Sequence, residues 1–585
     1  MQNNKSIQNW ILERYNTLLA TLKKEDFSFD DASNILKKKH EDSKAQVRNI
    51  LSDLTEAEMI ESRENPKDKR KRIYNLVPIA PEGKDQELSR QELNSLVDRA
   101  ADIIRTRVDY TFILLLLFYK RISDKWMYDY KKSIEKFKKE GFTEEEAKKE
   151  AKEPEYHDLD FPKKYLWQEL RKDPLSLSQN FSEAMKEIGD RNENLKNIFS
   201  QFDFIQFAEH KENSEILQQL FELLSSYSLE KASPDVLGDA YERILKKFAP
   251  EKAKEGEVYT PRQVVELMIR VLGPEAGDSV YDPALGSGIM LIKAHNYVIE
   301  KEGKKKADTL FLYGQEHSQK ILGLAHMNLI IHNIKQGFLE HGDTLLRPKF
   351  KDKGSFKRFD KGAYNPPWNQ KAYGEEELKK AEYSSERFQF GYTTKQSADW
   401  AWVQHMNASI KDSGKFTVVL DTGAVSRGSG SKSNREKVIR QKFVENDLIE
   451  AVILLPDNLF YNTSAPGIVM VVNKNKPKER KGKILLINAT NEFEKGKPKN
   501  FLTEENIKKI SETYQSFKEI DEFSVIVEKK EVEEADCNLS PSRFVFAINK
   551  EDHRSIKEIW KDIEKLEKEE KENDKKVGKI IGKLS

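Results

Sequence analysis

The spacing of hydrophobic residues divides the 585-residue chain into four segments. Residues 1–80 combine short amphipathic helices with a charged hairpin, and residues 86–250 carry hydrophobic positions at helical spacing throughout. From residue 251 to residue 548, short apolar strands alternate with helices, which is typical of an α/β domain with a doubly wound, Rossmann-like parallel sheet. Residues 549–585 are rich in lysine and glutamate and predict a helical tail.

The strands expected in the sheet are 279–281, 311–314, 416–420, 449–454 and 467–472. In the helical segment, residues 131–152 are so highly charged that we expect a solvated helical excursion. In the tail, apolar residues recur at helical spacing, and such a stripe outside a core needs a partner helix. These residues are Ile556, Ile559, Trp560, Ile563 and Leu566.

The first segment has the order of elements of a winged helix-turn-helix. Met59–Arg63 and Arg72–Val77 predict two strands, and the turn Asn65–Lys71 between them is basic. Asp42 or Ser43 would cap a helix that presents polar side chains, namely Lys44, Gln46, Arg48 and Asn49. Contact with DNA phosphates and contact with a protein partner both remain open for this segment.

The net charge does not indicate whether the chain binds nucleic acid, because the charges of 100 lysine and arginine residues nearly cancel those of 99 aspartate and glutamate residues. The single cysteine, Cys537, excludes an intramolecular disulfide and a multi-cysteine zinc site, and we expect it to be buried as a small apolar residue. The most apolar run, Phe112–Phe118, is far shorter than the roughly 20 residues that span a bilayer. With no signal-peptide pattern at the N-terminus, we expect a cytoplasmic protein that needs no membrane.

A glycine-rich turn follows the first expected strand. Asp282 ends this strand, and Gly286, Ser287, Gly288 and Ile289 lead into a helix. In a Rossmann-like sheet such a turn lies at the carboxyl edge, where glycine lets backbone amides approach a ligand closely. Because no Walker-type lysine accompanies the glycines, the pattern argues against nucleotide triphosphate chemistry.

Two further acidic residues follow strands in the expected order. Glu316 ends the second strand, and its carboxylate is suited to accept both ribose hydroxyls of a nucleoside cofactor. Asp343 follows a third strand end and is suited to accept from the amino group of the cofactor's adenine. Upstream, the extended piece Gly256–Arg262 precedes a helix and is expected to close over the other end of the cofactor.

The tetrapeptide Asn365-Pro366-Pro367-Trp368 carries the most specific chemistry in the chain. An adenine amino group is a poor nucleophile, because its lone pair is delocalised into the ring. The side-chain oxygen of Asn365 and the carbonyl oxygen of Pro366 can accept its two hydrogens, which directs the lone pair toward a sulfonium methyl group. Because the prolines fix the backbone, these acceptors are organised before the substrate arrives. Trp368 is then expected to stack on a base flipped out of the duplex.

With these residues, the chain resembles the modification subunits of type I restriction-modification systems, which are N6-adenine DNA methyltransferases. The resemblance runs from about Leu88 to Val545 and includes Tyr259-Thr260-Pro261-Arg262 and Ser426-Arg427-Gly428. It implies S-adenosylmethionine as cofactor, without a metal. The implied cofactor contacts are Glu257, Val258, Tyr259, Thr260, Pro261, Arg262, Ser287, Gly288, Ile289 and Glu316.

The resemblance also implies an assembly on double-stranded DNA. A separate specificity subunit would read the target sequence and dock on the C-terminal tail, and a restriction subunit and a second copy of the chain would join. Two alternatives stay open. One is a methyltransferase acting on a protein glutamine or on a guanine amino group of RNA, which poses the same lone-pair problem. The other is a catalytically silent DNA-binding or scaffold subunit.

Overall fold

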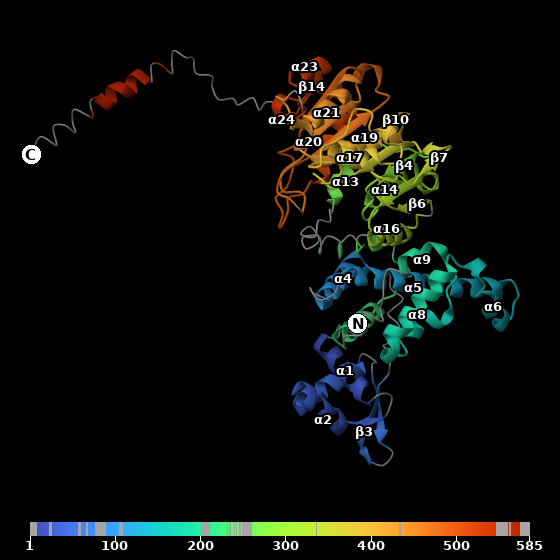
Figure 1. Cartoon of the computed structure of the whole chain (residues 1–585). Helices are drawn as coiled ribbons and strands as arrows, with labels where there is room; N and C mark the ends of the chain where they lie inside the picture. The colour runs from blue at the N-terminus through green and yellow to red at the C-terminus, as the bar shows by residue number, and fades with distance from the viewer. Residues whose placement is uncertain are drawn as a thin grey trace, which may run out of the picture.

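A computed structural model of the chain shows three successive units and a terminal helix (Figure 1). The described residues are 9–22, 26–56, 60–65, 68–76, 89–104, 109–199, 211–230, 232, 236–238, 240–241, 243–244, 247, 260–334, 336–431, 434–461, 463–545, 560, 563–571 and 573.

The first unit is a small helical bundle with a three-stranded antiparallel sheet of order β1-β3-β2. Its elements are α1 (Asn9–Leu22), β1 (Phe27–Ser28), α2 (Phe29–His40), α3 (Lys44–Glu56), β2 (Ile60–Asn65) and β3 (Asp68–Leu76). Leu18, Leu36 and Ile50 from the three helices fill a core of its own. The expected hairpin is present, whereas β1 was not expected, because two residues are too few to show a period.

The helical unit contains α4 (Arg90–Ile104), α5 (Thr111–Lys139), α6 (Glu144–Glu150), α7 (Trp167–Leu170), α8 (Leu177–Arg191), α9 (Glu193–Phe199) and α11 (Lys211–Ser225). Aromatic rings fill its centre, where Trp167 stacks on Phe221 with ring centroids 3.7 Å apart. The expected charged excursion corresponds to the exposed end of α5 and to α6, which hold only a small apolar cluster around Phe137.

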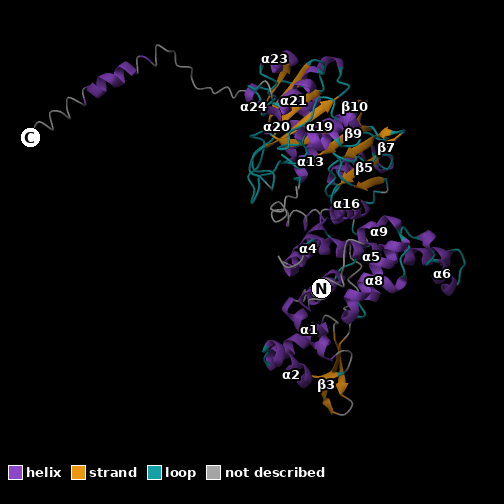
Figure 2. Ribbon diagram, in the orientation of Figure 1, coloured by secondary structure: helices purple, strands orange, loops and turns teal. Residues whose placement is uncertain are grey.

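The third unit is an α/β domain with a nine-stranded sheet (Figure 2). Its sheet strands are β4 (Ser279–Asp282), β5 (Phe311–Glu316), β6 (Gly337–His341), β9 (Phe359–Tyr364), β10 (Ile410–Asp421), β11 (Ile449–Leu454), β12 (Gly467–Asn473), β13 (Lys483–Asn488) and β14 (Ser524–Glu528). The sheet order is β14-β13-β11-β12-β10-β9-β4-β5-β6, and a separate small hairpin is formed by β7 (Lys351–Asp352) and β8 (Ser355–Phe356).

The larger helices of this domain are α13 (Arg262–Leu272), α14 (Ile289–Glu302), α16 (Gln319–Ile331), α19 (Asp399–Ser409), α21 (Arg435–Glu445) and α22 (Glu504–Ser516). The shorter ones are α15 (Lys304–Ala307), α17 (Glu375–Lys379), α18 (Ser384–Arg387), α20 (Gly423–Ser426), α23 (Lys529–Glu534) and α24 (Pro541–Phe544).

The sheet is mixed, which corrects the expectation of a parallel sheet. Strand β12 runs antiparallel to both of its neighbours, β10 and β11, and β14 runs antiparallel to β13. The chain passes from β11 to β12 through a loop without a crossover helix, and neighbouring strands joined in this way must run antiparallel. All five expected strands are present, β6 is the strand whose end was expected before Asp343, and β9, β13 and β14 are additional.

Both faces of the sheet are covered. Along β10, Val418 and Leu420 belong to the core cluster that includes α19 and α21, whereas Val419 between them belongs to the cluster that includes α13 and α14. This alternation follows from the two-residue period of strand side chains. Ile449–Leu454, which is apolar except for the buried Glu450, is therefore a strand buried on both faces.

Helix α16 joins the α/β domain to the helical unit. Leu324, Met327 and Ile331 of α16 belong to the hydrophobic core of the helical unit. The hydroxyl of buried Tyr241 donates to the carbonyl oxygen of Leu324 at 2.8 Å. The two units therefore share a continuous core around this helix.

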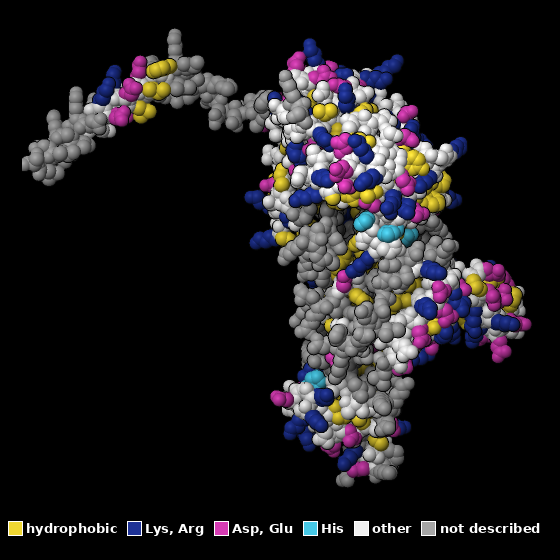
Figure 3. Space-filling model, viewed as in Figure 1, with side chains coloured by type: hydrophobic (Ala, Val, Ile, Leu, Met, Phe, Trp, Pro, Cys, Tyr) yellow, Lys and Arg dark blue, Asp and Glu magenta, His cyan; other side chains and the backbone are white. Residues whose placement is uncertain are grey.

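The described part of the C-terminal tail, residues 560, 563–571 and 573, is helical and carries exposed hydrophobic side chains (Figure 3). Trp560 and Leu566 are 60% and 64% exposed, and Ile563 is exposed as well. Ile556 and Ile559 of the expected stripe lie outside the described residues. Cys537 is buried, as expected. None of the helices described is both long and apolar enough to cross a membrane.

Candidate active site

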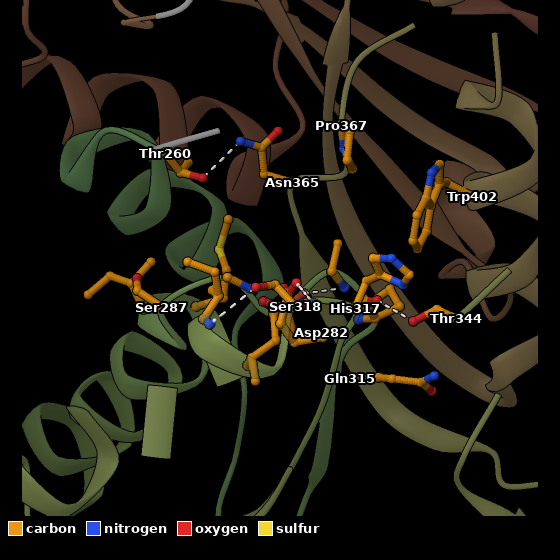
Figure 4. Close-up of a pocket in the computed structure, with 18 of the residues that line it drawn as sticks. Thr260, Asp282, Ser287, Gln315, His317, Ser318, Thr344, Asn365, Pro367 and Trp402 are labelled. Atoms are coloured by element: carbon orange, nitrogen blue, oxygen red, sulfur yellow. Dashed lines mark hydrogen bonds between the residues drawn. The ribbon is translucent and has the colours of Figure 1, made fainter. Parts of the chain in front are cut away.

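A cavity of about 400 Å³ lies at the carboxyl ends of β4, β5, β6 and β9. The carboxyl ends of parallel strands meet at one edge of a sheet, so turns from distant parts of the sequence converge there (Figure 4). The glycine-rich turn and the Asn365 loop line this same cavity. The two segments on which the sequence interpretation depends therefore face one space.

The turn after β4 needs glycine at two positions. Gly286 and Gly288 have φ angles of 52° and 78°, in the left-handed region that side chains other than glycine adopt only with strain. At Gly288, the residue that caps α14, a Cβ would also lie 3.0 Å from the side chain of Leu329. Gly286, Ser287 and Ile289 line the cavity, whereas Gly288 is not among its lining residues.

Three carboxylates, from Asp282, Glu316 and Asp343, line the cavity. Glu316 accepts the backbone N–H groups of Gly286 at 2.9 Å and Ser318 at 2.8 Å, one on each oxygen. Each oxygen keeps a second lone pair for a ligand. No lysine or arginine occurs among the described residues of the lining, so the electrostatics favour a cationic ligand over a phosphate.

Asp282 is the most perturbed of these carboxylates. Its side chain is 1% exposed, and its Oδ1 atom accepts the backbone N–H of Ala284 at 3.0 Å. Burial, together with repulsion from Glu316, raises the pKa of Asp282 to about 8. A positive charge placed in the cavity would favour the ionised form of this group.

The amide of Asn365 is held on both sides. Its Nδ2 atom donates to Oγ1 of Thr260 at 2.8 Å, and its Oδ1 atom accepts the indole N–H of Trp368 at 3.0 Å (Figure 4 shows the Thr260 contact). Because an indole N–H only donates, the atom that faces Trp368 must be the amide oxygen. The oxygen retains a second lone pair, which can accept from a substrate.

Trp368 itself is not among the lining residues of the cavity. Its ring meets Phe460 edge to face, with centroids 4.7 Å apart, and a Cβ at Gly467 would lie 2.9 Å from it. The tryptophan at the cavity wall is Trp402 of α19, whose indole N–H donates to Oε1 of Gln370 at 3.0 Å. In this structure Trp368 orients Asn365, and its stacking on a base stays a prediction.

The loop that follows the tetrapeptide is anchored at Asn369, which has a left-handed φ of 51°. Its backbone N–H donates to Asp399 at 2.9 Å, and its side-chain amide donates to Asp421 at 2.8 Å. Arg427 forms ion pairs with both of these carboxylates and with Glu436. Asp399 is fully buried, so this arginine compensates a charge that water does not reach.

Most of the predicted site residues lie together. Those that line the cavity are Thr260, Asp282, Gly286, Ser287, Ile289, Glu316, Asp343, Asn365 and Pro367. Those that the structure describes outside the lining are Pro261, Arg262, Gly288, Pro366 and Trp368. The predicted contacts Glu257, Val258 and Tyr259 lie outside the described residues.

Several lining residues were not predicted. Tyr110 comes from the helical unit, and Gln370, Tyr373 and Trp402 come from the region after the tetrapeptide. Tyr373 donates its hydroxyl hydrogen to Asp343 at 2.8 Å, which fixes one of the three carboxylates. No local motif surrounds these residues, so only the folded chain identifies them.

Two family models match the chain. Residues 232–553 match the model described as N-6 DNA Methylase, and residues 93–224 match the HsdM N-terminal domain. The match to N-6 DNA Methylase covers more than half of the 585 residues.

Curated relatives match over almost the whole length. The chain is 39% identical to the type I restriction enzyme MjaVIII methylase subunit of Methanocaldococcus jannaschii, over 97% of this chain and 96% of that protein. It is 38% identical to the MjaVII methylase subunit of the same organism, over 99% and 98% of the two chains. Among solved structures, the type I restriction-modification system methyltransferase subunit from Streptococcus thermophilus matches with a TM-score of 0.68 and 27% identity. That match covers 78% of this chain and 99% of the other.

Proposed function

The chain belongs to the family of type I restriction enzyme methylase subunits, and from this premise we propose that it methylates the N6 amino group of adenine in duplex DNA. The observation that carries the proposal is the shared cavity. Asn365, which is suited to accept from an amino group, and Gly286, whose turn is suited to hold a cofactor, line the same space.

The lining fits S-adenosylmethionine, which would supply an electrophilic methyl group when bound. This cofactor carries a sulfonium and an ammonium group, and the described lining offers three carboxylates without a lysine or arginine. Glu316 would hold the ribose hydroxyls through its remaining lone pairs, and Asp343 would accept from the adenine amino group. The Ser287–Ile289 turn and residues 257–262 would close around the rest, without a metal.

The chain's own contribution to the reaction is to prepare the substrate nitrogen. The free lone pair of Asn365 Oδ1 would accept one hydrogen of the adenine amino group, and the carbonyl oxygen of Pro366 would accept the other. The Asn365 amide is already oriented, and the two prolines would restrict the backbone that carries the Pro366 carbonyl, so little reorganisation would be needed when charge develops on the nitrogen. Trp368 and Thr260 keep the Asn365 amide in the required orientation.

Aromatic rings would hold the base in the cavity. Reaching N6 requires that the adenine leave the duplex, which costs a few kcal/mol of stacking. Trp402, 6% exposed, is the tryptophan ring at the wall of the cavity, and Trp368 was the ring expected from the sequence. Stacking on either ring would offset part of that cost.

We propose that the chain acts within an assembly. A specificity subunit would read the target sequence and dock on the tail, residues 549–585, whose described helix carries exposed Trp560, Ile563 and Leu566. A restriction subunit and a second copy of the chain would join, in the cytoplasm. In this proposal the chain has a winged-helix-like domain at residues 1–80, a helical domain at residues 86–250 and a catalytic domain at residues 251–548.

The test is transfer of labelled methyl groups to duplex DNA by the chain mixed with its specificity subunit. We expect N6-methyladenine in the product, and Asn365→Ala should slow its formation strongly while binding of S-adenosylmethionine survives. Loss of one such acceptor raises the barrier by about 2.7–4 kcal/mol, or roughly 10²–10³ in rate. The control is Asn296→Ala, an asparagine on α14 that does not line the cavity.

Other outcomes would redirect the assignment. Transfer to RNA or to protein, with none to DNA, would favour the amide- or guanine-modifying alternative. Cofactor binding without transfer to any of these acceptors would favour a catalytically silent scaffold.

A further inference from the structure

The N-terminal unit has no place in the catalytic site. Among the described residues, none before Tyr110 lines the cavity, and the two matched family models begin at residues 93 and 232. The unit nevertheless has its own hydrophobic core and its own sheet. Its function must therefore be sought on its surface.

The order α1-β1-α2-α3-β2-β3, with β3 paired between β1 and β2, is that of a winged helix-turn-helix. Only three residues, Glu41–Ser43, separate α2 from α3. Ser43 caps α3, because its hydroxyl oxygen accepts the backbone N–H of Gln46 at 3.3 Å. Asp42, the other expected cap, instead forms an ion pair with Arg14 at 3.1 Å.

Helix α3 presents a polar outer face. Its inner side buries Val47, Ile50, Leu51 and Leu54 in the core of the unit. Its exposed residues in the first turns are Lys44, Ala45, Gln46, Arg48 and Asn49. A face that docks a protein usually offers large apolar or aromatic anchors, and this face has none. Lysine, arginine, glutamine and asparagine are instead the side chains that contact base edges in a major groove.

Exposed basic residues flank this helix in sequence on both sides. Lys37, Lys38 and Lys39 lie in the last turn of α2, and Lys71 and Arg72 lie on β3 of the hairpin. None of the three α2 lysines, nor Lys44 or Lys71, forms an ion pair among the residues that the structure describes. Their charge is therefore available to an external anion.

Several acidic residues of the unit are engaged internally. Asp26 accepts from Asn75 at 3.0 Å and forms an ion pair with Arg63. Asp31 accepts from the backbone and hydroxyl of Ser28 at the start of α2, the opposite end from the lysines. Glu41, Glu61 and Glu64 remain exposed, so the basic side chains are concentrated at the end of α2 and the start of α3 rather than over the whole unit.

We propose that α3 and the β2–β3 hairpin form a second contact with duplex DNA, separate from the catalytic cavity. Lysines of α2, α3 and β3 bind phosphates, and Gln46, Arg48 and Asn49 face the groove. The inference rests on the proposed function only in taking duplex DNA as the partner, because binding here requires neither the cofactor nor methyl transfer. The contact would hold the duplex while the cavity takes up one base.

The test measures binding of the full chain to a fluorescein-labelled duplex of arbitrary sequence by fluorescence anisotropy over a range of salt concentrations. The variant K37A/K38A/K44A/K71A removes four exposed lysines. The slope of log K against log salt should become shallower by up to about 3.6, since each phosphate contact contributes about 0.9. Affinity at low salt should fall by at least about tenfold.

The matched control, K131A/K132A/K139A/K149A, removes four exposed lysines from α5 and α6. It changes the net charge by the same amount, so it should retain the affinity and slope of the unmodified chain. Equal losses in both variants would overturn the proposal, as would the absence of salt-dependent binding by the unmodified chain. Unchanged DNA binding with loss of the specificity subunit in a co-purification assay would show a protein contact and would also overturn it.

Cofactor binding is measured on the same preparations, and methyl transfer is measured after the specificity subunit has been added to them. A chain that binds duplex DNA through this surface but transfers no methyl group would contradict the proposed function and leave this inference standing. Retained binding of S-adenosylmethionine by the lysine variant shows that the α/β domain is intact, and an unchanged far-UV circular dichroism spectrum and thermal denaturation profile show that the N-terminal unit is folded as well.

Discussion

The indole N–H of Trp368 points at the side-chain oxygen of Asn365, 3.0 Å away, and not into the cavity. This contact fixes which end of the amide is the acceptor. With Thr260 on the other side, the amide is oriented before a substrate is present. The tetrapeptide thus contains both the acceptor and the residue that orients it.

Replacing Trp368 with phenylalanine should keep the contact with Phe460 but remove the hydrogen bond to Asn365. The net contribution of such a bond is about 0.5–1.5 kcal/mol, so we expect methyl transfer to slow by a few-fold to about tenfold. In single-turnover assays the loss should fall on the chemical step, with cofactor affinity unchanged. Trp126→Phe, in a helix whose tryptophan does not line the cavity, is the comparison; a normal rate for Trp368→Phe would argue against an orienting role.

Thr260 offers a matched pair of substitutions. Thr260→Val leaves Nδ2 of Asn365 without its acceptor, whereas Thr260→Ser retains the hydroxyl group. An unsatisfied buried donor costs about 1–3 kcal/mol, so the valine variant should be less stable and less active, and the serine variant close to normal. Urea denaturation and methyl transfer measure the two effects, and identical behaviour of both variants would contradict this role for the hydroxyl.

Asp282 should make the stability of the cofactor-free protein depend on pH. Its folded-state pKa, raised to about 8, lies above the roughly 3.9 of an unfolded chain. Its contribution to the free energy of unfolding is therefore fully present below about pH 4 and is lost as the pH rises toward about 8. Compared with the unmodified chain, Asp282→Asn should lose less stability between these limits, as thermal denaturation at a series of pH values would show.

The raised pKa of Asp282 also predicts that cofactor binding depends on pH. A cationic cofactor favours ionised Asp282, so its affinity should rise with pH up to about 8 and be accompanied by proton release. Calorimetry in buffers of different ionisation enthalpy measures the protons released. Release of the same number of protons by Asp282→Asn would rule this carboxyl out as their source.

Arg427 should stabilise the loop after the tetrapeptide. Arg427→Met leaves fully buried Asp399 without its counter-charge, and breaking a buried pair in this way costs about 3–5 kcal/mol. The added change Asp399→Asn removes the uncompensated charge and should restore part of the free energy of unfolding. Urea denaturation of the single and double variants measures this coupling, and purely additive losses would show that the two residues act independently.

The sequence by itself determined the features that depend on neighbouring residues. The strands before Asp282 and Glu316 are short apolar runs, and the two glycines with left-handed φ angles lie in the turn that their spacing predicted. The tetrapeptide that begins at Asn365 could likewise be identified from consecutive residues alone. Because parallel strands align their carboxyl ends, the order of these motifs was enough to predict that they share one edge of a sheet.

Only the tertiary structure decided the rest, because it depends on contacts between distant residues. Strand β9, which precedes Asn365, is interrupted by Asp360 and Lys361, and Gly362 within it leaves room for the side chains of Met406 and Phe416. The antiparallel direction of β12 depends on which strands it lies between. Tyr110 and Trp402 reach the cavity from a helical unit and from α19, and the direction of the Trp368 ring is set by Phe460 and Gly467. The pattern of residues along the chain does not predict such packing, because each contact joins residues that are far apart in sequence at no regular spacing.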